Sequence, residues 1–350
     1  MTAFALLRHL AFCAALACVS ALVVRGMIAA GLMDQPDARK LHAVPIPRGG
    51  GVGIVVAFLL GIMLLYGFAE FARIAAPYFQ GVIVAALGIA LVGLLDDWLD
   101  WPFAAKLAAQ LAAAGLAVGS GLTVRALHLP WFGTVDADLW GVPITLLWLL
   151  FVTNAVNFID GMNGLAAGTS LVAAFFLAAI AATQGAWFAY FAGLLLAAGI
   201  AGFLPFNFPR ARIFMGDVGS QFCGFMLGVL GIAAARFERV ELSFLLVPML
   251  LSGVLWDVAF TLLRRGFAGE NLARAHRGHL YQLAQRSGMD ARLIAMLHWG
   301  FTGLGGIAVF ALMALPESAR PLAPLALLVP QIWWTLFVLQ RARHAPIGAW

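Results

Sequence analysis

Long apolar stretches separated by short polar segments repeat along almost the whole chain. A helix needs ~20 mainly apolar residues to cross a bilayer, and these stretches are too long and continuous for the strands of a membrane barrel. The pattern therefore predicts a single all-α, polytopic membrane domain over residues 1–350, with about 10–11 transmembrane helices. The expected spans are residues 10–32, 50–68, 78–95, 104–120, 141–158, 164–182, 186–204, 218–235, 242–262, 291–314 and 322–340.

The composition agrees with this class, because 63% of the residues are hydrophobic and only 11% are charged. We expect the first span to be a retained helix rather than a signal peptide, since Arg25 falls inside it and no small-residue cleavage site follows it. The net charge of +5 is explained by basic residues that anchor the chain to anionic lipid, so it does not indicate nucleic-acid binding.

Basic residues predict how the chain is oriented. With the 33–49 loop inside and the spans alternating, the inside segments hold 14 Lys and Arg residues and the outside segments hold six. Cytoplasmic loops are enriched in these residues, so the N-terminus is expected outside and the C-terminus inside. The same alternation places five polar segments on the cytoplasmic side. They are DQPDARKLHAVPIPRGGG, LLDDWLD, NAVNFIDGMNG, FNFPRARIFMGDVGS and RRGFAGENLARAHRGHLYQ.

Three carboxylates in these segments suit a hard cation. Asp96 and Asp97 end one predicted span, and Asp217 opens another in a Gly-Asp-x-Gly-Ser turn. Mg²⁺ prefers oxygen ligands and is usually held by one or two carboxylates together with substrate phosphates. For Asp217 the alternative is that it caps the following helix.

Asn154, Asn157 and Asp160 are spaced by three residues at the inner end of a span, so they lie near one face of a helix. Polar groups at such positions usually face a cavity or the interior of the bundle and are candidates for function. The alternative is a hydrogen-bonded seam between two helices.

The longest inside loop, residues 264–292, is rich in Arg and His. At this density these side chains suit a phosphate or a diphosphate, although basic residues near a membrane also contact lipid headgroups. Asp257, inside a predicted span, needs a partner, and an Arg of this loop is one candidate. The candidates for phosphate contact in the loop are Arg265, His276, Arg277 and His279. Weaker candidates in the first loop are Lys40, His42 and Arg48.

Carboxylates for a metal and cations for phosphates, all at one membrane surface, indicate phosphoryl transfer between a soluble donor and a lipid phosphate. A transporter with ion-coupled carboxylates is the alternative, but its site should lie near mid-bilayer. The chain lacks the DG-x2-AR-x8-G-x3-D-x3-D run of the CDP-alcohol phosphotransferases. A binding scaffold would not need so many carboxylates.

The ordered set DQPDARKLH…PRGGG, LLDDWLD, NAVNFIDGMNGLAAG, NFPRARIFMGDVGS and AHRGHLYQ resembles the polyprenyl-phosphate N-acetylhexosamine-1-phosphate transferases, glycosyltransferase family 4. The resemblance spans nearly the whole chain. It implies Mg²⁺- or Mn²⁺-dependent transfer of an N-acetylhexosamine 1-phosphate from a UDP-sugar to undecaprenyl phosphate, with UMP released. It also implies a bacterial inner membrane protein with a cytoplasmic-face site, and it leaves a homodimer open.

The resemblance also assigns residues. Asp217 matches the metal ligand, and Asp96 and Asp97 match an essential pair, in which Asp97 acts as a general base or also contacts the metal. The residues that match the cleft lining are Asn154, Asn157 and Asp160. Phe214 matches a position that stacks on uracil, and Lys106 matches one that contacts phosphate.

Two departures narrow the resemblance. Asn163 replaces the second Asp of a common Asp-Gly-x-Asp-Gly run, so that residue's role in nucleotide binding is open. The AHRGHLYQ segment, with His279 as a catalytic candidate, stands where the peptidoglycan enzyme has three consecutive His residues. This form is more similar to the branch that initiates O-antigen in lipopolysaccharide synthesis, whose donors include N-acetylfucosamine and N-acetylquinovosamine.

Overall fold

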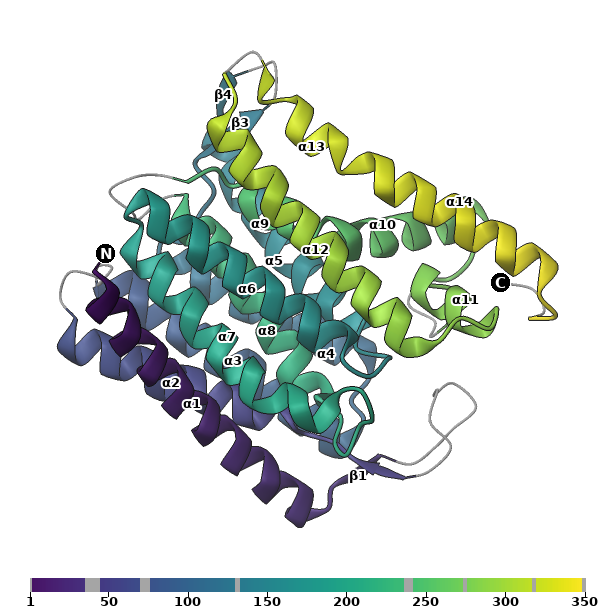
Figure 1. Cartoon of the computed structure of the whole chain (residues 1–350), viewed down its shortest axis with the longest axis horizontal. Helices are drawn as coiled ribbons and strands as arrows, with labels where there is room; N and C mark the ends of the chain where they lie inside the picture. The colour runs from purple at the N-terminus through teal and green to yellow at the C-terminus, as the bar shows by residue number, and fades with distance from the viewer. Residues whose placement is uncertain are drawn as a thin grey trace.

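The computed structural model describes residues 2–34, 45–69, 76–129, 133–235, 242–272, 276–316 and 319–347. These residues form a bundle of helices with two short hairpins (Figure 1). The helices are α1 (Ala3–Ala30), α2 (Gly51–Phe68), α3 (Ala76–Leu99), α4 (Phe103–Gly119), α5 (Gly141–Phe158), α6 (Leu165–Gln184), α7 (Trp187–Asn207), α8 (Gly216–Ala234), α9 (Leu246–Leu250), α10 (Ser252–Phe267), α11 (Leu280–Arg286), α12 (Ala291–Ala314), α13 (Leu322–Ala326) and α14 (Leu328–His344). Strands β1 (Met33–Asp34) and β2 (Ile46–Pro47) pair antiparallel, as do β3 (Ala126–Leu129) and β4 (Gly133–Asp136).

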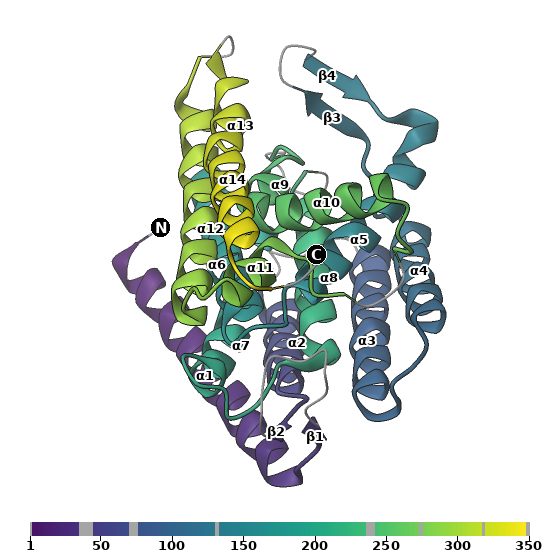
Figure 2. The same cartoon turned by 90° about the vertical axis from the view of Figure 1, so that its right-hand side faces the viewer.

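The prediction of an all-α, polytopic membrane protein is confirmed. Within the described ranges, nine helices are long and apolar enough to cross a membrane, and α4 is a shorter apolar helix. The prediction of one span over 242–262 is wrong, because this stretch forms α9 and α10, which are separated at Leu251. Helix α10 lies across the direction of α3 and α4 (Figure 2).

Helix α8 forms the centre of the bundle. All its residues from Val218 to Ala234 are buried, and it packs against α2, α3, α5, α6 and α7. Small residues permit the close approaches: a Cβ on Gly93 of α3 would lie 2.6 Å from the backbone nitrogen of Val218. The N-terminus of α8 is therefore fixed from several sides.

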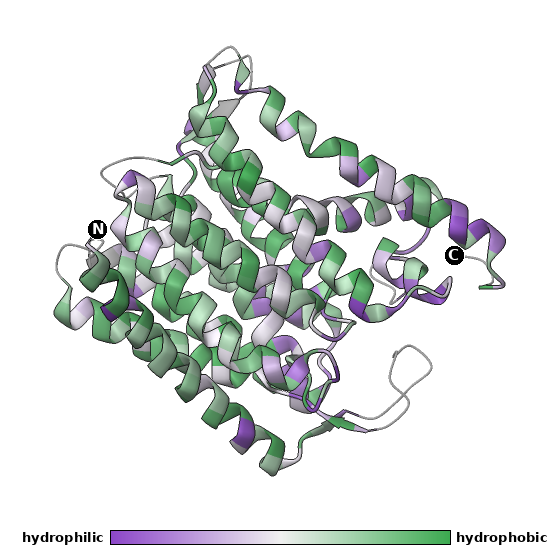
Figure 3. Ribbon diagram, in the orientation of Figure 1, coloured by the Kyte–Doolittle hydropathy of each residue, from purple (hydrophilic) through white to green (hydrophobic). Residues whose placement is uncertain are grey.

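Hydrophilic residues gather at one end of the bundle. Figure 3 shows hydrophilic colouring at the right, where α11 and the C-terminal end of α14 lie, and largely hydrophobic colouring along the helices. Helix α14 shows the same change along its length, with exposed Trp333 and Leu336 before Arg341 and Arg343 in its last turn. The apolar surface between the helix ends is suited to lipid.

Candidate active site

Asp97, at the end of α3, holds the first turn of α8. Its Oδ1 accepts a hydrogen bond from the N–H of Asp217 at 3.1 Å, and its Oδ2 accepts one from the N–H of Val218 at 3.3 Å. Gly216 has φ +76°, and a Cβ there would lie 2.4 Å from Asp97 Oδ2. The two acidic motifs of the sequence therefore meet directly, as carboxylate and helix N-terminus.

Lys106 of α4 lies between two carboxylates from other helices. Its Nζ pairs with Oδ2 of Asp96 at 2.5 Å and with Oδ2 of Asp217 at 3.4 Å. Asp96 also accepts a hydrogen bond from the N–H of Trp101 at 2.8 Å. The side chain of Asp96 is 6% exposed and that of Asp217 is 24% exposed, so Asp217 is the more accessible carboxylate.

Amide side chains donate hydrogen bonds to both oxygens of Asp217. Asn157 donates from Nδ2 to Oδ1 of Asp217 at 3.0 Å and to Ser220 Oγ at 2.9 Å. Gln221 donates to Oδ2 of Asp217 at 2.9 Å. Asn154, one turn earlier in α5, bonds to Gln110 instead of to a carboxylate. Gln110 and Gln221 were not predicted from the sequence, although each stands four residues after a site residue, on the same helix face.

Two carboxylates that lie close to one cation are suited to binding Mg²⁺ or Mn²⁺. Asp96 and Asp217 already share the ammonium group of Lys106. Among the residues that the structure describes, no three His, Cys, Asp or Glu side chains form a metal-ligand group. The oxygen donors present fit an ion that takes one or two carboxylates and completes its coordination with substrate phosphates and water.

Asp160 and Asn163 lie in the short turn between α5 and α6. Burial, followed by the negative charges of Asp217 and Asp97, raises the pKa of Asp160 well above its ordinary value, which favours its protonated form. Asn163 is half-buried. Asp160 therefore belongs electrostatically to the carboxylate site.

The AHRGHLYQ segment packs on the same end of α5 through α11. Asp257 accepts hydrogen bonds from His279 Nδ1 at 3.1 Å and from the N–H groups of Leu280 and Tyr281 at 2.9 and 3.0 Å. Tyr281 donates from its hydroxyl to the carbonyl of Phe158 at 3.0 Å. Asp257 is thus partnered by His279, two backbone amides and the hydroxyl of Thr261, whereas the sequence suggested an Arg.

The basic candidates of this loop differ in their surroundings. Arg265 is buried and forms an ion pair with Glu270 at 2.8 Å, so the negative charge of Glu270 neutralises its guanidinium group. Burial, then the positive charges of His279, Arg265 and Arg264, lowers the pKa of His276 to about 4. The ring of His276 lies 4.9 Å from that of His279. Arg277 is half-buried, and its carbonyl accepts a hydrogen bond from Arg286.

The first loop is joined to the Phe-Met-Gly-Asp turn by backbone hydrogen bonds. Phe214 donates to Pro47 at 2.8 Å and accepts from the N–H of Gly50 at 2.9 Å. Arg48 pairs with Asp34 at 3.4 Å and with Asp100 at 3.7 Å. Phe214 is half-buried at the entrance to α8. Lys40 and His42 lie outside the described residues.

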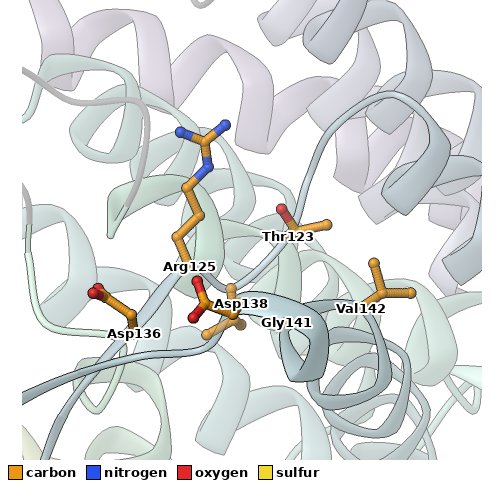
Figure 4. A pocket seen from close by; sticks show the side chains of 7 residues that line it. Thr123, Arg125, Asp136, Asp138, Gly141 and Val142 are labelled. Atoms are coloured by element: carbon orange, nitrogen blue, oxygen red, sulfur yellow. The ribbon is translucent and has the colours of Figure 1, made fainter.

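A cavity of about 370 Å³ occurs at the opposite end of α5, beside the β3–β4 hairpin. Figure 4 shows its side chains, with the guanidinium group of Arg125 directed away from Asp136 and Asp138. It is lined by Thr123, Val124, Arg125, Asp136, Asp138, Gly141 and Val142. Since Asn157 is at the other end of α5, this cavity is separate from the carboxylate site.

A lysine, carboxylates and amides that meet where membrane helices end define a site suited to phosphates at a bilayer surface. The sequence model of Glycosyl transferase family 4 matches residues 79–235, from α3 to the end of α8. The chain belongs to the polyprenyl-phosphate N-acetylglucosamine-1-phosphate transferases of this family. The resemblance inferred from the motifs is therefore confirmed.

Similar proteins come from several bacteria. The probable undecaprenyl-phosphate N-acetylglucosaminyl 1-phosphate transferase of Bacillus subtilis is 31% identical over 80% of this chain and 76% of its own length. The decaprenyl-phosphate N-acetylglucosaminephosphotransferase of Mycobacterium tuberculosis is 30% identical over 78% of this chain and 74% of its own. The undecaprenyl-phosphate alpha-N-acetylglucosaminyl 1-phosphate transferase of Thermotoga maritima is 28% identical, over 73% of each chain.

Proposed function

We propose that this protein transfers an N-acetylhexosamine 1-phosphate from a UDP-sugar to undecaprenyl phosphate, which releases UMP. The observation that carries the proposal is the convergence of Asp96, Asp217 and Lys106 at the N-terminus of α8, in a chain whose relatives bear names of this reaction type. Phosphoryl transfer depends mainly on positioning and on neutralising charge, and this group of side chains is suited to both.

In the proposed reaction an oxygen of the lipid phosphate attacks the β-phosphorus of the donor. The new phosphorus–oxygen bond gives the lipid diphosphate sugar, and the phosphoanhydride bond breaks to release UMP. Lys106 would stabilise negative charge on the phosphoryl oxygens, and Phe214 would stack on uracil at the entrance to α8. Mg²⁺, held by Asp217 and Asp96, would add Lewis-acid stabilisation of the same oxygens. The lipid phosphate, with a second pKa of ~6, needs little help from a base such as Asp97.

The donor sugar and the pathway are finer parts of the proposal. The names of the relatives give N-acetylglucosamine as the sugar those proteins handle, whereas the AHRGHLYQ segment is similar to the O-antigen branch. We therefore propose initiation of a cell-envelope glycan such as O-antigen, at the cytoplasmic face of the bacterial inner membrane. A panel of UDP-N-acetylhexosamines, beginning with N-acetylglucosamine, would identify the donor.

The test is the nucleotide that purified protein releases from a labelled UDP-sugar and undecaprenyl phosphate. We expect UMP, loss of turnover in EDTA and recovery with Mg²⁺. The Asp217→Asn variant should lose about 100-fold or more in rate, because it weakens the stabilisation of phosphoryl charge. Asp136→Asn, an exposed position on β4, is the matched control and should keep full activity. Accumulation of UDP in place of UMP would refute the proposed reaction.

A further inference from the structure

Three amide side chains from three helices lie beneath the carboxylate site. Gln110 on α4, Asn154 on α5 and Gln221 on α8 each stand about one helix turn deeper than a site residue of the same helix, namely Lys106, Asn157 and Asp217. Gln110 is 3% exposed and Gln221 is fully buried. Amides buried in a bundle are costly unless they are hydrogen-bonded, so their bonding pattern fixes their orientation.

Gln110 and Asn154 form a reciprocal amide pair. Asn154 Nδ2 donates to Gln110 Oε1 at 2.6 Å, and Gln110 Nε2 donates to Asn154 Oδ1 at 3.4 Å. Asn154 Nδ2 also donates to the carbonyl of Leu150 at 2.8 Å, which ties the pair to α5. An amide has donors on one side and an acceptor on the other, so the Leu150 carbonyl fixes which way the NH₂ group of Asn154 faces. The pair then sets which way the NH₂ group of Gln110 faces.

The orientation of the Gln110 amide determines that of Gln221, which in turn contacts Asp217. Gln110 Nε2 donates to Gln221 Oε1 at 3.0 Å, so the NH₂ group of Gln221 faces Asp217 and donates to its Oδ2 at 2.9 Å. Asn157 holds Oδ1, and Lys106 also contacts Oδ2. These three donors occupy most of the roughly four lone-pair directions of a carboxylate and leave the exposed part of Asp217 facing outward.

We propose that Gln110 and Gln221 are positioning residues for the cation site, and that their directed hydrogen bonds hold Asp217 in the orientation that binds a divalent cation. This inference rests on the metal role of Asp217 in the proposed function. Gln110 has no hydrogen bond to Asp217 and acts through Gln221. Partners that orient a metal-binding side chain typically change metal affinity 10–100-fold when they are removed.

The test is direct Mn²⁺ binding to the purified full chain in detergent, measured by the loss of the free-ion electron paramagnetic resonance signal without substrate. We expect Gln221→Met and Gln110→Met each to raise the Kd for Mn²⁺ by about 10-fold or more. The double variant should be no weaker than Gln221→Met, because the two residues act in series. Gln331→Met, which changes a buried amide on α14, is the matched control and should leave the Kd unchanged.

A purely structural role would lower the unfolding temperature of Gln110→Met and leave its Kd for Mn²⁺ unchanged, which would overturn the proposal. Losses that add in the double variant, or no Mn²⁺ binding by the unaltered chain, would overturn it too. Should Gln110→Met fail to fold, Asn154→Leu breaks the same amide pair from α5 and is expected to give the same Kd. The assay needs neither donor nor lipid, so a failure to release UMP would refute the reaction alone.

Discussion

The environments of Asp97 and His276 differ from those that their residue types suggested. Asp97 was expected to act as a base or metal ligand, and its two oxygens accept N–H groups at the start of α8. His276 was expected to contact phosphate, and its lowered pKa leaves it neutral at neutral pH. Its Nδ1 accepts a hydrogen bond from the N–H of Gly278 at 3.1 Å. Any phosphate contact that it makes there is a hydrogen bond rather than an ion pair.

The lowered pKa of His276 predicts how stability depends on pH. The folded protein binds this proton only near pH 4, whereas the unfolded chain binds it near the ordinary value of 6.5. The neutral ring thus favours folding above about pH 6.5, and this contribution is lost as the pH falls towards 4. His276→Gln should therefore lose less stability between pH 6.5 and pH 4 than the unaltered protein, as measured by thermal unfolding in detergent. His344→Gln, at the exposed end of α14, is the control, and an unchanged slope for His276→Gln would contradict the prediction.

The sequence predicted the charged members of the site better than its neutral members. Asp96 and Asp217 stand out because a charge beside an apolar run is costly unless it has a function, and Lys106 was assigned through the family resemblance. Gln110 and Gln221 are uncharged, so they are a weaker signal in apolar helices. Their roles depend on which helices pack together. The partner of Asp257 was also set by a tertiary contact, since His279 lies in a different helical segment.

Among the elements, α2 and α8 approach each other closely beside the site. A Cβ added to Gly51 would lie 2.2 Å from Cα of Gly219, a backbone atom that cannot rotate away. Gly51 also donates from its N–H to the carbonyl of Met215 at 2.8 Å. The Gly-rich end of the first loop therefore allows the start of α2 to pack against the start of α8, beside the carboxylates.

Gly51→Ala should destabilise the protein by about 1–3 kcal/mol, the usual cost of overpacking, and should also lower activity, because it displaces the start of α8. Gly67→Ala, in the same helix with no atom of the described residues within 4 Å of the added Cβ, should be neutral or slightly stabilising, since Ala favours helix over Gly. Unfolding temperatures in detergent would compare the two variants. Equal unfolding temperatures would show that the α2–α8 contact can relax.

Apolar length predicted the helices well because lipid leaves backbone groups no partners outside the helix. The same rule could not predict the separation of α9 from α10. There α12 approaches closely, and a Cβ on Gly305 would lie 2.2 Å from the carbonyl oxygen of Met249. Helix α10 then buries one face, which includes Asp257 and Arg265, and exposes Phe267. Its direction depends on that packing and not on its hydrophobicity.

Across the whole molecule, the polar motifs from distant parts of the sequence meet at one end of the bundle. The starts of α4 and α8 and the ends of α3 and α5 supply the carboxylate site, and α11 packs beside it. The β3–β4 hairpin lies at the other end of α5 (Figures 1 and 2). This polarity is the arrangement expected for an enzyme that works at one membrane surface, whereas a transporter site should lie near the middle of the bilayer.

The distribution of basic residues, 14 on one side and six on the other, predicts that the carboxylate end faces the cytoplasm. Single cysteines in a variant without Cys13, Cys18 and Cys223 would test this in intact bacteria. Glu270→Cys, in the exposed loop after α10, should resist a membrane-impermeant maleimide until the cells are opened. Thr134→Cys, on exposed β4, should react in intact cells and serves as the positive control. The reverse pattern would place the carboxylate site outside, away from cytosolic nucleotide sugars, and would contradict the proposed function as well as the orientation.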